Sequence, residues 1–343
     1  MEAWNALAYC FWKKGDVRQA RTCYEGALDR GKSRATLRDL SMLLRDARLV
    51  EGGGGEKKKS DTKKMSTIAV DEAKRANLSR SVDCAKRAVA LDVNDGRSWY
   101  YLGNAYLAFF FNASCKTEDI HRALKAYAAA ESKGEGARNP DLHFNRGNVF
   151  KFMERFDEAA VSYRKAAALD PSLPAETALA DMRRRFVKVE SVIRKGGRIK
   201  AKRLDALVES LPTDALVAHP SKKFCDVVRF ADCVNGRNPG KAVHVKCILV
   251  ARSGEEPPAT LIVADASKTV RAISVYNLTL DAVAHISKAA YLTLIEPTLS
   301  RVSFDKASYA NAQITDPRLL LVCGKPIPTN ERPMPALKTE TFD

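Results

Sequence analysis

The feature that most constrains this chain is a spaced pattern of large, small and turn-forming residues near its N-terminus. Small residues stand where two helices would cross closely, and large ones stand where neighbouring helix pairs would meet. The positions of the pattern are Trp4, Leu7, Ala8, Phe11, Gly15, Asp16, Ala20, Tyr24 and Ala27. Because one such helix pair cannot bury its apolar face alone, the pattern predicts a stack of several pairs.

The same pattern returns three times further along the chain. A degenerate copy runs from 37 to 92, a clear copy from 99 to 130 and another from 147 to 171. The spacing and residue types are those of the tetratricopeptide repeat, of which about three copies suffice for a stable stack. The sequence therefore predicts an α-solenoid of four helix pairs over residues 1–174. The concave side of such a stack binds extended peptides.

Two segments next to the repeats have a different character. Residues 51–64, EGGGGEKKKSDTKK, interrupt the second repeat with glycines and lysines that bury nothing, which predicts a flexible insertion. A helix over 175–194 is expected to cap the array. Gly196-Gly197 then separates it from another short helix that reaches Leu211. Residues 175–211 thus form a capping helix and a basic helical segment.

After Pro212 the hydrophobic period changes from that of helices to that of strands. Six runs are bounded by turn-forming residues: 224–230, 243–250, 260–263, 270–276, 291–295 and 319–322. A helix is expected between the fourth and fifth runs, over 278–287. This order predicts a small OB-type β-barrel over 212–329, followed by a disordered tail over 330–343. The expected fold class is α+β multidomain, an α-solenoid followed by an OB fold.

The net charge of +16 is unevenly distributed. Within residues 183–203, ten basic side chains stand against Glu190 alone. The basic residues are Arg183, Arg184, Arg185, Lys188, Arg194, Lys195, Arg198, Lys200, Lys202 and Arg203. A solvated helix face is one interpretation of such a run. The ten-to-one ratio favours contact with a polyanion, for which a phosphate backbone is the natural partner.

The composition argues against several classes of protein. No apolar run approaches the ~20 residues of a membrane span, and the start, MEAWNALAYC, has no basic-then-apolar signal peptide. The eight cysteines are scattered and form no CxxC pair, so no metal or other cofactor is expected and the cytosol or nucleus is indicated. Nucleotide-binding, zinc-protease and serine-hydrolase motifs are absent, so we expect no enzyme activity.

Counting from the start of each repeat identifies the first-helix positions that would line the concave face. These positions carry arginines, acids, asparagines and aromatic residues. They are Asn5, Tyr9, Trp12, Lys13, Arg38, Met42, Arg45, Asp46, Arg97, Tyr100, Asn104, Leu107, Asp141, Phe144, Asn148 and Lys151. Each could simply be a solvated helix residue. Together they suit a short peptide with one acidic and one basic side chain, whose backbone asparagines would clamp.

Several longer blocks are more specific than the repeat pattern. They include KKGDVRQARTCYEGAL, LSMLLRD, DVNDGRSWYYLGNAYLAFFF, NPDLHFNRGNVFKF, AAALDPSLP and LLLVCGKP. The chain, from Trp4 to about 326, resembles the tetratricopeptide repeat protein five (Strap) family, which combines helical repeats with a C-terminal OB fold. The family also has helical sequence before the first repeat matched here, so a truncated N-terminus is an open interpretation.

The resemblance implies tubulin autoregulation. The groove would capture the N-terminal peptide of nascent α- and β-tubulin at the ribosome exit. An adaptor that recruits a deadenylase complex would then promote decay of the translated messenger. A nuclear role is also implied, as a stress-responsive co-activator scaffold with an acetyltransferase. The OB fold would then contact DNA, for which Arg271 and Tyr276 are the only hints. A generic chaperone-docking protein is a third interpretation, which the acid Asp141 disfavours.

The motifs carry over residue by residue. Arg45 of LSMLLRD and Asp141 of NPDLH match the family's peptide-binding positions, and Lys200 and Lys202 of GRIKAKR match its ribosome-contacting lysines. The family has an acid where this chain has Ala175, and Glu176 is the expected substitute. The expected peptide-binding residues are Arg45, Asp141, Arg38, Arg97, Asn104, Asn148 and Glu176. The expected contacts with ribosomal RNA are Lys200, Lys202, Arg198 and Arg203.

Overall fold

The fold of the chain is described from a computed structural model. It describes residues 2–49, 67–221, 223–252 and 258–328. The expected insertion at 51–64 and the expected tail at 330–343 lie outside the described residues. The chain divides into two compact units. The first comprises mainly residues 1–146 with 168–170, and the second residues 147–167 with 171–335.

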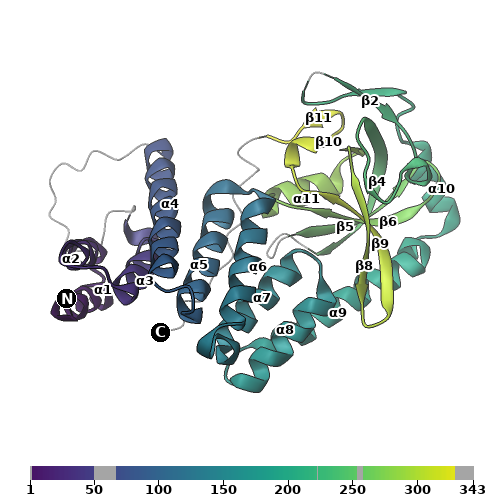
Figure 1. The fold of residues 1–343 in the computed structure, drawn as a ribbon. Coiled ribbons are helices and arrows are strands. Elements are labelled where there is room, and N and C mark those ends of the chain that lie inside the picture. The colour runs from purple at the N-terminus through teal and green to yellow at the C-terminus, as the bar shows by residue number, and fades with distance from the viewer. Residues whose placement is uncertain (1, 50–66, 222, 253–257, 329–343) are drawn as a thin grey trace. The chain divides into compact units, whose positions relative to one another are not determined.

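The first unit consists of antiparallel helices (Figure 1). They are α1 (Glu2–Lys13), α2 (Val17–Asp29), α3 (Arg34–Leu43), α4 (Thr67–Leu91), α5 (Gly96–Phe109), α6 (Thr117–Glu131) and the start of α7 (Pro140–Phe152). Three short helical segments connect them: η1 (Ala47–Leu49), η2 (Phe110–Ser114) and η3 (Gly134–Arg138). This order confirms the helical repeats that the spaced pattern predicts.

Local chemistry fixes where these helices begin and how closely they cross. The side chains of Asp16 and Ser33 cap α2 and α3, because each accepts a hydrogen bond from a backbone N–H in the first turn. A Cβ atom at Gly103 would lie 2.5 Å from the Tyr127 ring, so the repeat glycine is needed for the close crossing of α5 and α6. The small-against-large pattern of the sequence is therefore a packing requirement.

The second unit combines helices with an eleven-stranded curled sheet. Its helices are α8 (Phe156–Leu169), α9 (Ala175–Arg194), η4 (Gly196–Arg198), α10 (Ala201–Glu209), η5 (Phe230–Asp232), α11 (Leu280–Lys288) and η6 (Pro317–Leu319). Its strands are β1 (Leu216–Ala218), β2 (Phe224–Val227), β3 (Gly236–Arg237), β4 (Lys241–Arg252), β5 (Ala259–Asp265), β6 (Val270–Val275), β7 (Leu292–Ile295), β8 (Thr298–Phe304), β9 (Ala307–Ile314), β10 (Leu320–Val322) and β11 (Lys325–Pro326). The expected helix at 175–194 coincides with α9.

The strand order confirms the OB-type barrel. Strands β4, β5 and β6 form an antiparallel meander, β7 returns to pair with β4, and β9 pairs in parallel with β6. Helix α11 lies between β6 and β7 in the chain. The barrel core is apolar and includes Val245, Leu261, Ile273, Leu294 and Ala312. This is the OB-type arrangement of a curled sheet with one helix that the sequence predicts.

Strands β8 and β9, which continue the sheet beyond β6, were not predicted from the sequence. Their sequences, TLSRVSF and ASYANAQI, mix polar residues with apolar ones, so they lack the apolar runs that mark the other strands. The reason lies in the fold: Asn311 and Gln313 of β9 point away from the core and bind a polar partner. A strand with two occupied faces need not show a simple alternation.

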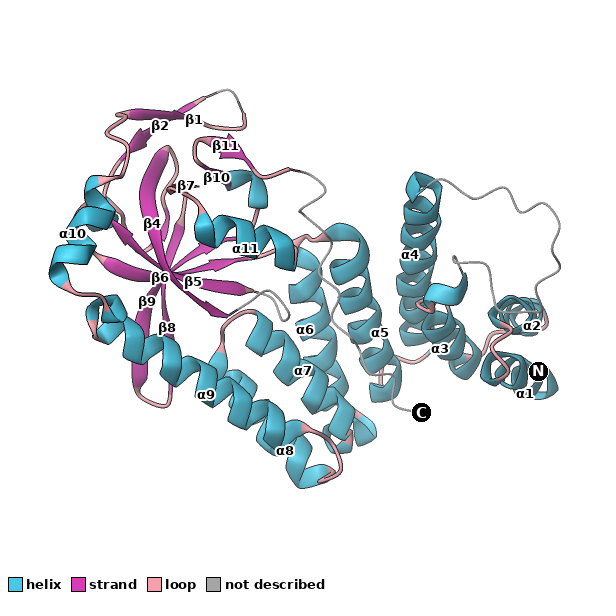
Figure 2. Ribbon diagram, turned by 180° about the vertical axis from the view of Figure 1, so that it is seen from behind, coloured by secondary structure: helices cyan, strands magenta, loops and turns pink. Residues whose placement is uncertain are grey.

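The outer face of the barrel is covered by elements of the same unit (Figure 2). Helix α9 contacts β4, β6 and β9, and α10 contacts β4. Val208 of α10 and Leu211 after it pack with Ala264 of β5 in a separate apolar cluster. Phe186 of α9 packs against Phe304 and Tyr309 at ring-centroid distances of 5.6 and 5.2 Å. The face of β5 and β6 is therefore an internal packing surface.

A buried carboxylate from the turn between α7 and α8 completes this cover. Glu154 is 6% exposed and accepts hydrogen bonds from Ser274 Oγ at 2.6 Å, Asn311 Nδ2 at 2.9 Å and Gln313 Nε2 at 3.2 Å. The Tyr276 hydroxyl donates to Phe152 O at 3.1 Å beside it. Glu154 also has a φ of 58°, in the left-handed region that favours glycine. The contact thus holds a strained turn against β6 and β9.

Replacing Glu154 should destabilise the second unit, because buried donors on β6 and β9 would lose their acceptor. Each unpaired buried donor costs about 1–3 kcal/mol, so Glu154→Ala should lower Tm by roughly 5–10 °C in calorimetry. Glu154→Gly also removes the carboxylate but fits the left-handed backbone, so its loss should be smaller. The control is Glu158→Ala on α8, which breaks an exposed ion pair with Arg155. Equal Tm values for Glu154→Ala and the control would contradict the role of the carboxylate.

Candidate peptide-binding groove and basic surface

Arg45 is a cation of the first unit. It has no counter-ion among the described residues. It lies just beyond Leu44, the residue that caps the end of α3, and its backbone N–H donates to Met42 O. The side chain is half-buried, and its buried Nε has no hydrogen-bond partner within the described part of the chain. Burial lowers the pKa of Arg45, although a guanidinium stays charged at neutral pH. An anionic group of a ligand would stabilise a half-buried cation in this state.

Asp141 is an anion of the same unit, and it too lacks a counter-ion among the described residues. It lies in the first turn of α7 and is half-buried. Burial, and to a lesser extent the neighbouring carboxyl group of Asp170, raises the pKa of Asp141. Among the described residues it forms no ion pair. A basic group of a ligand would relieve both the burial and the repulsion from Asp170.

Tyr100 of α5 connects the two charges. Its hydroxyl interacts electrostatically with both Asp141 and Arg45, and burial raises the pKa of Tyr100 to about 12. Asn145 of α7 donates from Nδ2 to this hydroxyl at 3.2 Å. Arg45, Tyr100 of α5 and Asp141 of α7 are thus electrostatic neighbours on the surface that the repeat count identifies, with a cation and an anion on it. We call this surface, defined by Arg45, Tyr100 and Asp141, the groove.

The structure gives the other expected groove residues of the first unit different roles. Arg38 donates from Nη1 to Asp95 Oδ2 at 2.5 Å and so supports the start of α5. Asn104 is buried, and its Oδ1 accepts from Tyr127 Oη at 2.5 Å and from Asn145 Nδ2 at 3.3 Å. Arg97 is exposed and forms no ion pair with a described residue. Only Arg97 of these three has its side chain available to a ligand.

Asn148 and Glu176 lie in the second unit. Asn148 accepts a hydrogen bond from Tyr163 Oη at 2.7 Å, which joins α7 to α8. Glu176 is exposed in the first turn of α9, next to the fully buried Ala175. A carboxylate near a helix N-terminus is stabilised by the helix dipole.

Asp39, a further acid on α3, was not predicted from the sequence as a binding residue. It is half-buried on α3, and burial raises its pKa although Arg38 and Arg97 oppose that shift. No hydrogen bond or ion pair joins it to a described residue. The repeat count assigns Arg38, and not Asp39, to the concave face. The position of Asp39 next to Arg38 was therefore the only indication in the sequence that it lies near the binding surface.

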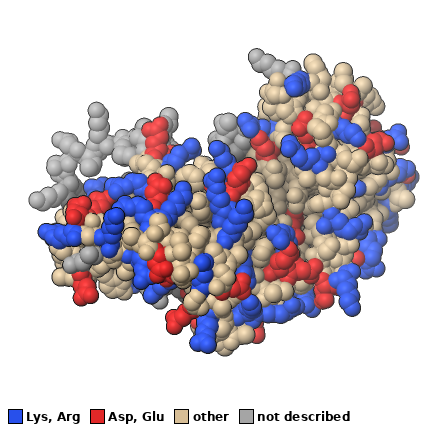
Figure 3. Space-filling view, in the orientation of Figure 1, with Lys and Arg blue, Asp and Glu red and all other residues tan. Residues whose placement is uncertain are grey.

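The residues that were expected to contact RNA form a second surface. Arg198, Lys200, Lys202 and Arg203 are all exposed, on η4 and the start of α10. Arg198 donates to Ser191 Oγ at 2.8 Å, whereas the three other side chains have no partner among the described residues. Figure 3 shows Lys and Arg side chains along the stretch that α9 occupies in Figure 1. This basic surface suits a polyanion.

Gly197 fixes the basic surface to the barrel. Its φ is 79°, and a Cβ atom there would lie 3.0 Å from Ile248 Cδ1 of β4. A side chain at this position would strain the backbone and crowd β4. The Gly-Gly break that the sequence shows is therefore a docking point of the turn between α9 and α10.

The two residues that suggested DNA binding, Arg271 and Tyr276, both pack against aromatic rings of the protein. Tyr276 is 6% exposed, and its ring packs on Phe152 at 5.1 Å between centroids. Arg271 stacks on Phe230 at 5.0 Å. Tyr276 therefore does not present its ring for base stacking.

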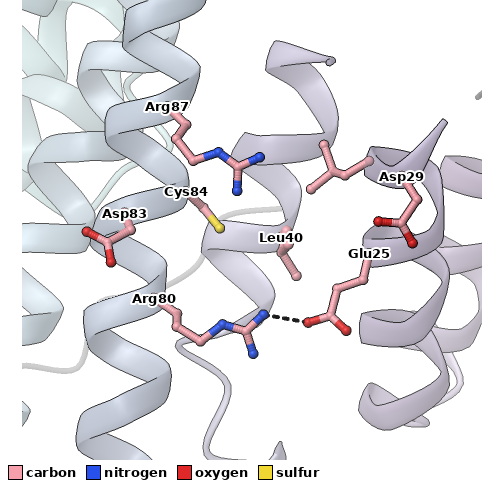
Figure 4. Close-up of a pocket in the computed structure, with 8 residues that line it drawn as sticks. Glu25, Asp29, Leu40, Arg80, Asp83, Cys84 and Arg87 are labelled. Atoms are coloured by element: carbon pink, nitrogen blue, oxygen red, sulfur yellow. Dashed lines mark hydrogen bonds and ion pairs between the residues drawn. The ribbon is translucent and has the colours of Figure 1, made fainter. Parts of the chain in front are cut away.

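A cavity of about 360 Å³ lies between α2 and α4 in the first unit. Arg80, Cys84 and Arg87 reach it from α4, and Glu25 and Asp29 from α2 (Figure 4). Arg80 Nη2 donates to Glu25 Oε1 at 2.7 Å across it. The basic and acidic side chains that line this cavity largely neutralise one another, in contrast to the charges of the groove.

Within the described ranges, no group of three or more His, Cys, Asp or Glu side chains could hold a metal ion. No described helix is both long and apolar enough to cross a membrane.

Comparisons with known proteins agree with the fold. Residues 2–30 and 140–173 match the model of the tetratricopeptide repeat, and residues 225–334 match that of the tetratricopeptide repeat protein 5 OB fold domain. The chain is 33% identical over 341 residues to tetratricopeptide repeat protein 5 of Mus musculus and 33% identical over 342 residues to that of Bos taurus. Each alignment covers 95% of this chain and 73% of the relative.

A solved tetratricopeptide repeat protein of Thermus thermophilus is 19% identical, with a TM-score of 0.40 over 57% of this chain and 88% of that chain.

The fold and the matched families define a tetratricopeptide-repeat adaptor with a C-terminal OB fold. Repeats of this kind are typically non-catalytic, and the matched families indicate no enzyme. At this identity and coverage, the chain belongs to the tetratricopeptide repeat protein 5 family.

Arg45 and Arg38 should respond oppositely to the same substitution. Arg45→Met removes a half-buried cation that has no counter-ion among the described residues, so Tm should stay constant or rise. Arg38→Met leaves Asp95 without its closest cation and should lower Tm by roughly 3–6 °C. Differential scanning fluorimetry of both variants would measure this. A loss of stability in Arg45→Met as large as that in Arg38→Met would show that Arg45 is a structural residue.

Proposed function

We propose that this adaptor recognises the N-terminal peptide of nascent tubulin at the ribosome exit and so triggers decay of tubulin messenger RNA. The main support is the pair of uncompensated charges in the groove, Arg45 and Asp141, both of which interact electrostatically with Tyr100. The tubulin peptide begins with methionine, arginine and glutamate, followed by an apolar residue. Its two adjacent opposite charges complement those of the groove.

The geometry of an extended peptide supports this match. Successive side chains of an extended chain point to opposite sides, so an Arg-Glu pair would direct its charges apart. We infer that Asp141 binds the arginine and Arg45 binds the glutamate, with Tyr100 beneath the backbone. A guanidinium–carboxylate contact is directional and can be bidentate. Arg97 is an exposed cation on the same helix as Tyr100 and would add long-range attraction for the glutamate.

The basic surface would supply the second half of the function. Lys200, Lys202 and Arg203 are exposed cations without described partners, and ribosomal RNA offers phosphates around the exit. Contact there would hold the groove close to emerging peptides in the cytoplasm. Messenger decay would then follow from an adaptor that recruits a deadenylase. The groove and the basic surface lie in different units of the chain, so they can be altered separately.

Neutralising either groove charge should weaken binding of a synthetic tubulin N-terminal peptide. Charge-assisted hydrogen bonds contribute roughly 1.5–3 kcal/mol, so Arg45→Ala or Asp141→Ala should raise Kd at least about tenfold. Fluorescence anisotropy measures Kd, and circular dichroism verifies that the helical signal is retained.

The matched control is Arg48→Ala, which removes an exposed arginine paired with Asp46 after the same helix. Its Kd should stay within about twofold of the parent. A peptide with its arginine and glutamate exchanged should bind more weakly to the parent chain. Unchanged affinity in both Arg45→Ala and Asp141→Ala would remove the groove from the proposal.

Reversing the charge of the basic surface should abolish ribosome association but leave peptide binding intact. Lys200→Glu combined with Lys202→Glu places acids against RNA phosphates, and co-sedimentation with ribosomes should be lost. In the parent chain, co-sedimentation should decrease steeply as salt increases, because phosphate contacts release counterions. Ribosome association that is insensitive to salt, or loss of peptide binding in the double variant, would contradict this division between the two surfaces.

A further inference from the structure

Two arginines lie in one row across three neighbouring strands of the barrel. Ala272 of β6 pairs with Asn311 of β9, and the two strands are parallel, so Arg271 lies beside Ala310. Ala310 in turn pairs with Arg301 of β8. Arg271 and Arg301 thus flank a small residue, with backbones two strand spacings or about 9–10 Å apart.

The row lies at one end of the barrel interior. The next row along the same strands is Ile273, Ala312 and Leu299, and all three belong to the barrel core. Side chains two residues apart in a strand share a face, so Arg271, Ala310 and Arg301 share the inner face. Val263 of the core is the cross-strand partner of Arg271 on β5. We call this row, with Phe230 beneath Arg271, the arginine mouth.

The two guanidinium groups have no anionic partner among the described residues. Arg271 stacks on the buried Phe230 ring at 5.0 Å, and its Nε is buried without a hydrogen bond. Arg301 is exposed and donates from Nη1 to Ser308 Oγ at 3.0 Å, which leaves most of its donors unused. The two arginines also repel one another, and burial lowers the pKa of Arg271. Their proximity therefore disfavours the empty state.

The acids near the arginine mouth are already engaged. Asp265 accepts hydrogen bonds from the backbone N–H groups of Phe230, Ser267 and Thr269. Asp232 accepts from the Arg229 backbone N–H at 3.1 Å. Neither carboxylate forms an ion pair with Arg271 or Arg301 within the described residues. Of the two other titratable groups nearby, Cys233 is a thiol whose pKa burial raises, and Lys241 is a further cation.

We propose that the arginine mouth is a binding site for a phosphate group, either inorganic phosphate or the phosphate of a nucleotide. A phosphate has enough oxygens to accept from two guanidinium groups at once, whereas a single carboxylate is satisfied by one arginine. Between the two arginines in the row, Ala310 contributes only a methyl side chain. Phosphate binding would neutralise the repulsion and satisfy the buried Nε of Arg271. The site uses no residue of the groove or of the basic surface, so it is independent of the proposed function.

The test follows the Nε–Hε signals of Arg271 and Arg301 by NMR while inorganic phosphate, adenosine 5′-monophosphate or acetate is added to the full chain. The chain carries Lys200→Glu and Lys202→Glu, so that the basic surface does not compete for anions. Phosphate should shift both signals in a saturable way, and acetate should bind at least tenfold more weakly. Tighter binding of the nucleotide than of inorganic phosphate would identify a nucleotide as the source.

Arg301→Gln should weaken phosphate binding at least tenfold, and Arg271→Gln should do the same if that variant folds. Arg301 is exposed, so its replacement tests the site even where loss of the Arg271–Phe230 contact prevents folding. The matched control is Arg237→Gln on β3, an exposed arginine outside the arginine mouth. Its cross-strand partner Thr298 is adjacent to Leu299 of the inner face, so Thr298 and Arg237 lie on the opposite face. The control variant should stay within twofold of the parent. No saturable shift of either signal, or equal weakening in Arg237→Gln, would overturn the proposal.

Discussion

Glu154 presses a buried carboxylate against the outer face of β6 and β9, where Ser274, Asn311 and Gln313 donate hydrogen bonds to it. A buried charge is tolerated only where other interactions replace its water, and here several hydrogen bonds do so. Those donors are polar residues on strands that would otherwise face solvent or a ligand. The second unit therefore depends on this contact in two ways. It fixes the turn between α7 and α8, and it covers part of the outer face of β6 and β9.

In the groove, by contrast, the buried charges are not satisfied by hydrogen bonds or ion pairs among the described residues. Arg45 and Asp141 are half-buried charges whose hydration is reduced and whose counter-charges are absent among the described residues. Such an arrangement destabilises the free protein, which is typical of sites that keep their interactions for a ligand. Nearby, Arg38 and Asn104 have the same residue types as expected binding residues but are engaged by Asp95 and Tyr127. Residue type alone does not distinguish a binding residue from a structural one.

Sequence reasoning succeeded where the signal is local. The repeat positions, including the Gly103–Tyr127 crossing, follow from spacing within one helix pair. The helix at 175–194 ends at the Gly196-Gly197 break. Sequence reasoning failed at β8 and β9. On β9, the polar residues Asn311 and Gln313 are explained only by the carboxylate that they bind. Counting along repeats reached Arg45 and Asp141 but missed Asp39, which is buried by its neighbours.

The sequence by itself determined the class of fold, the repeat register and the concentration of positive charge at 183–203, because each depends on residues close together in the chain. The tertiary structure decided which charges remain uncompensated. Arg271 and Arg301 are distant in sequence, and the parallel pairing of β6 with β9 makes them neighbours. Strand register and burial are set by contacts between remote segments, and periodicity within a segment carries no information about them.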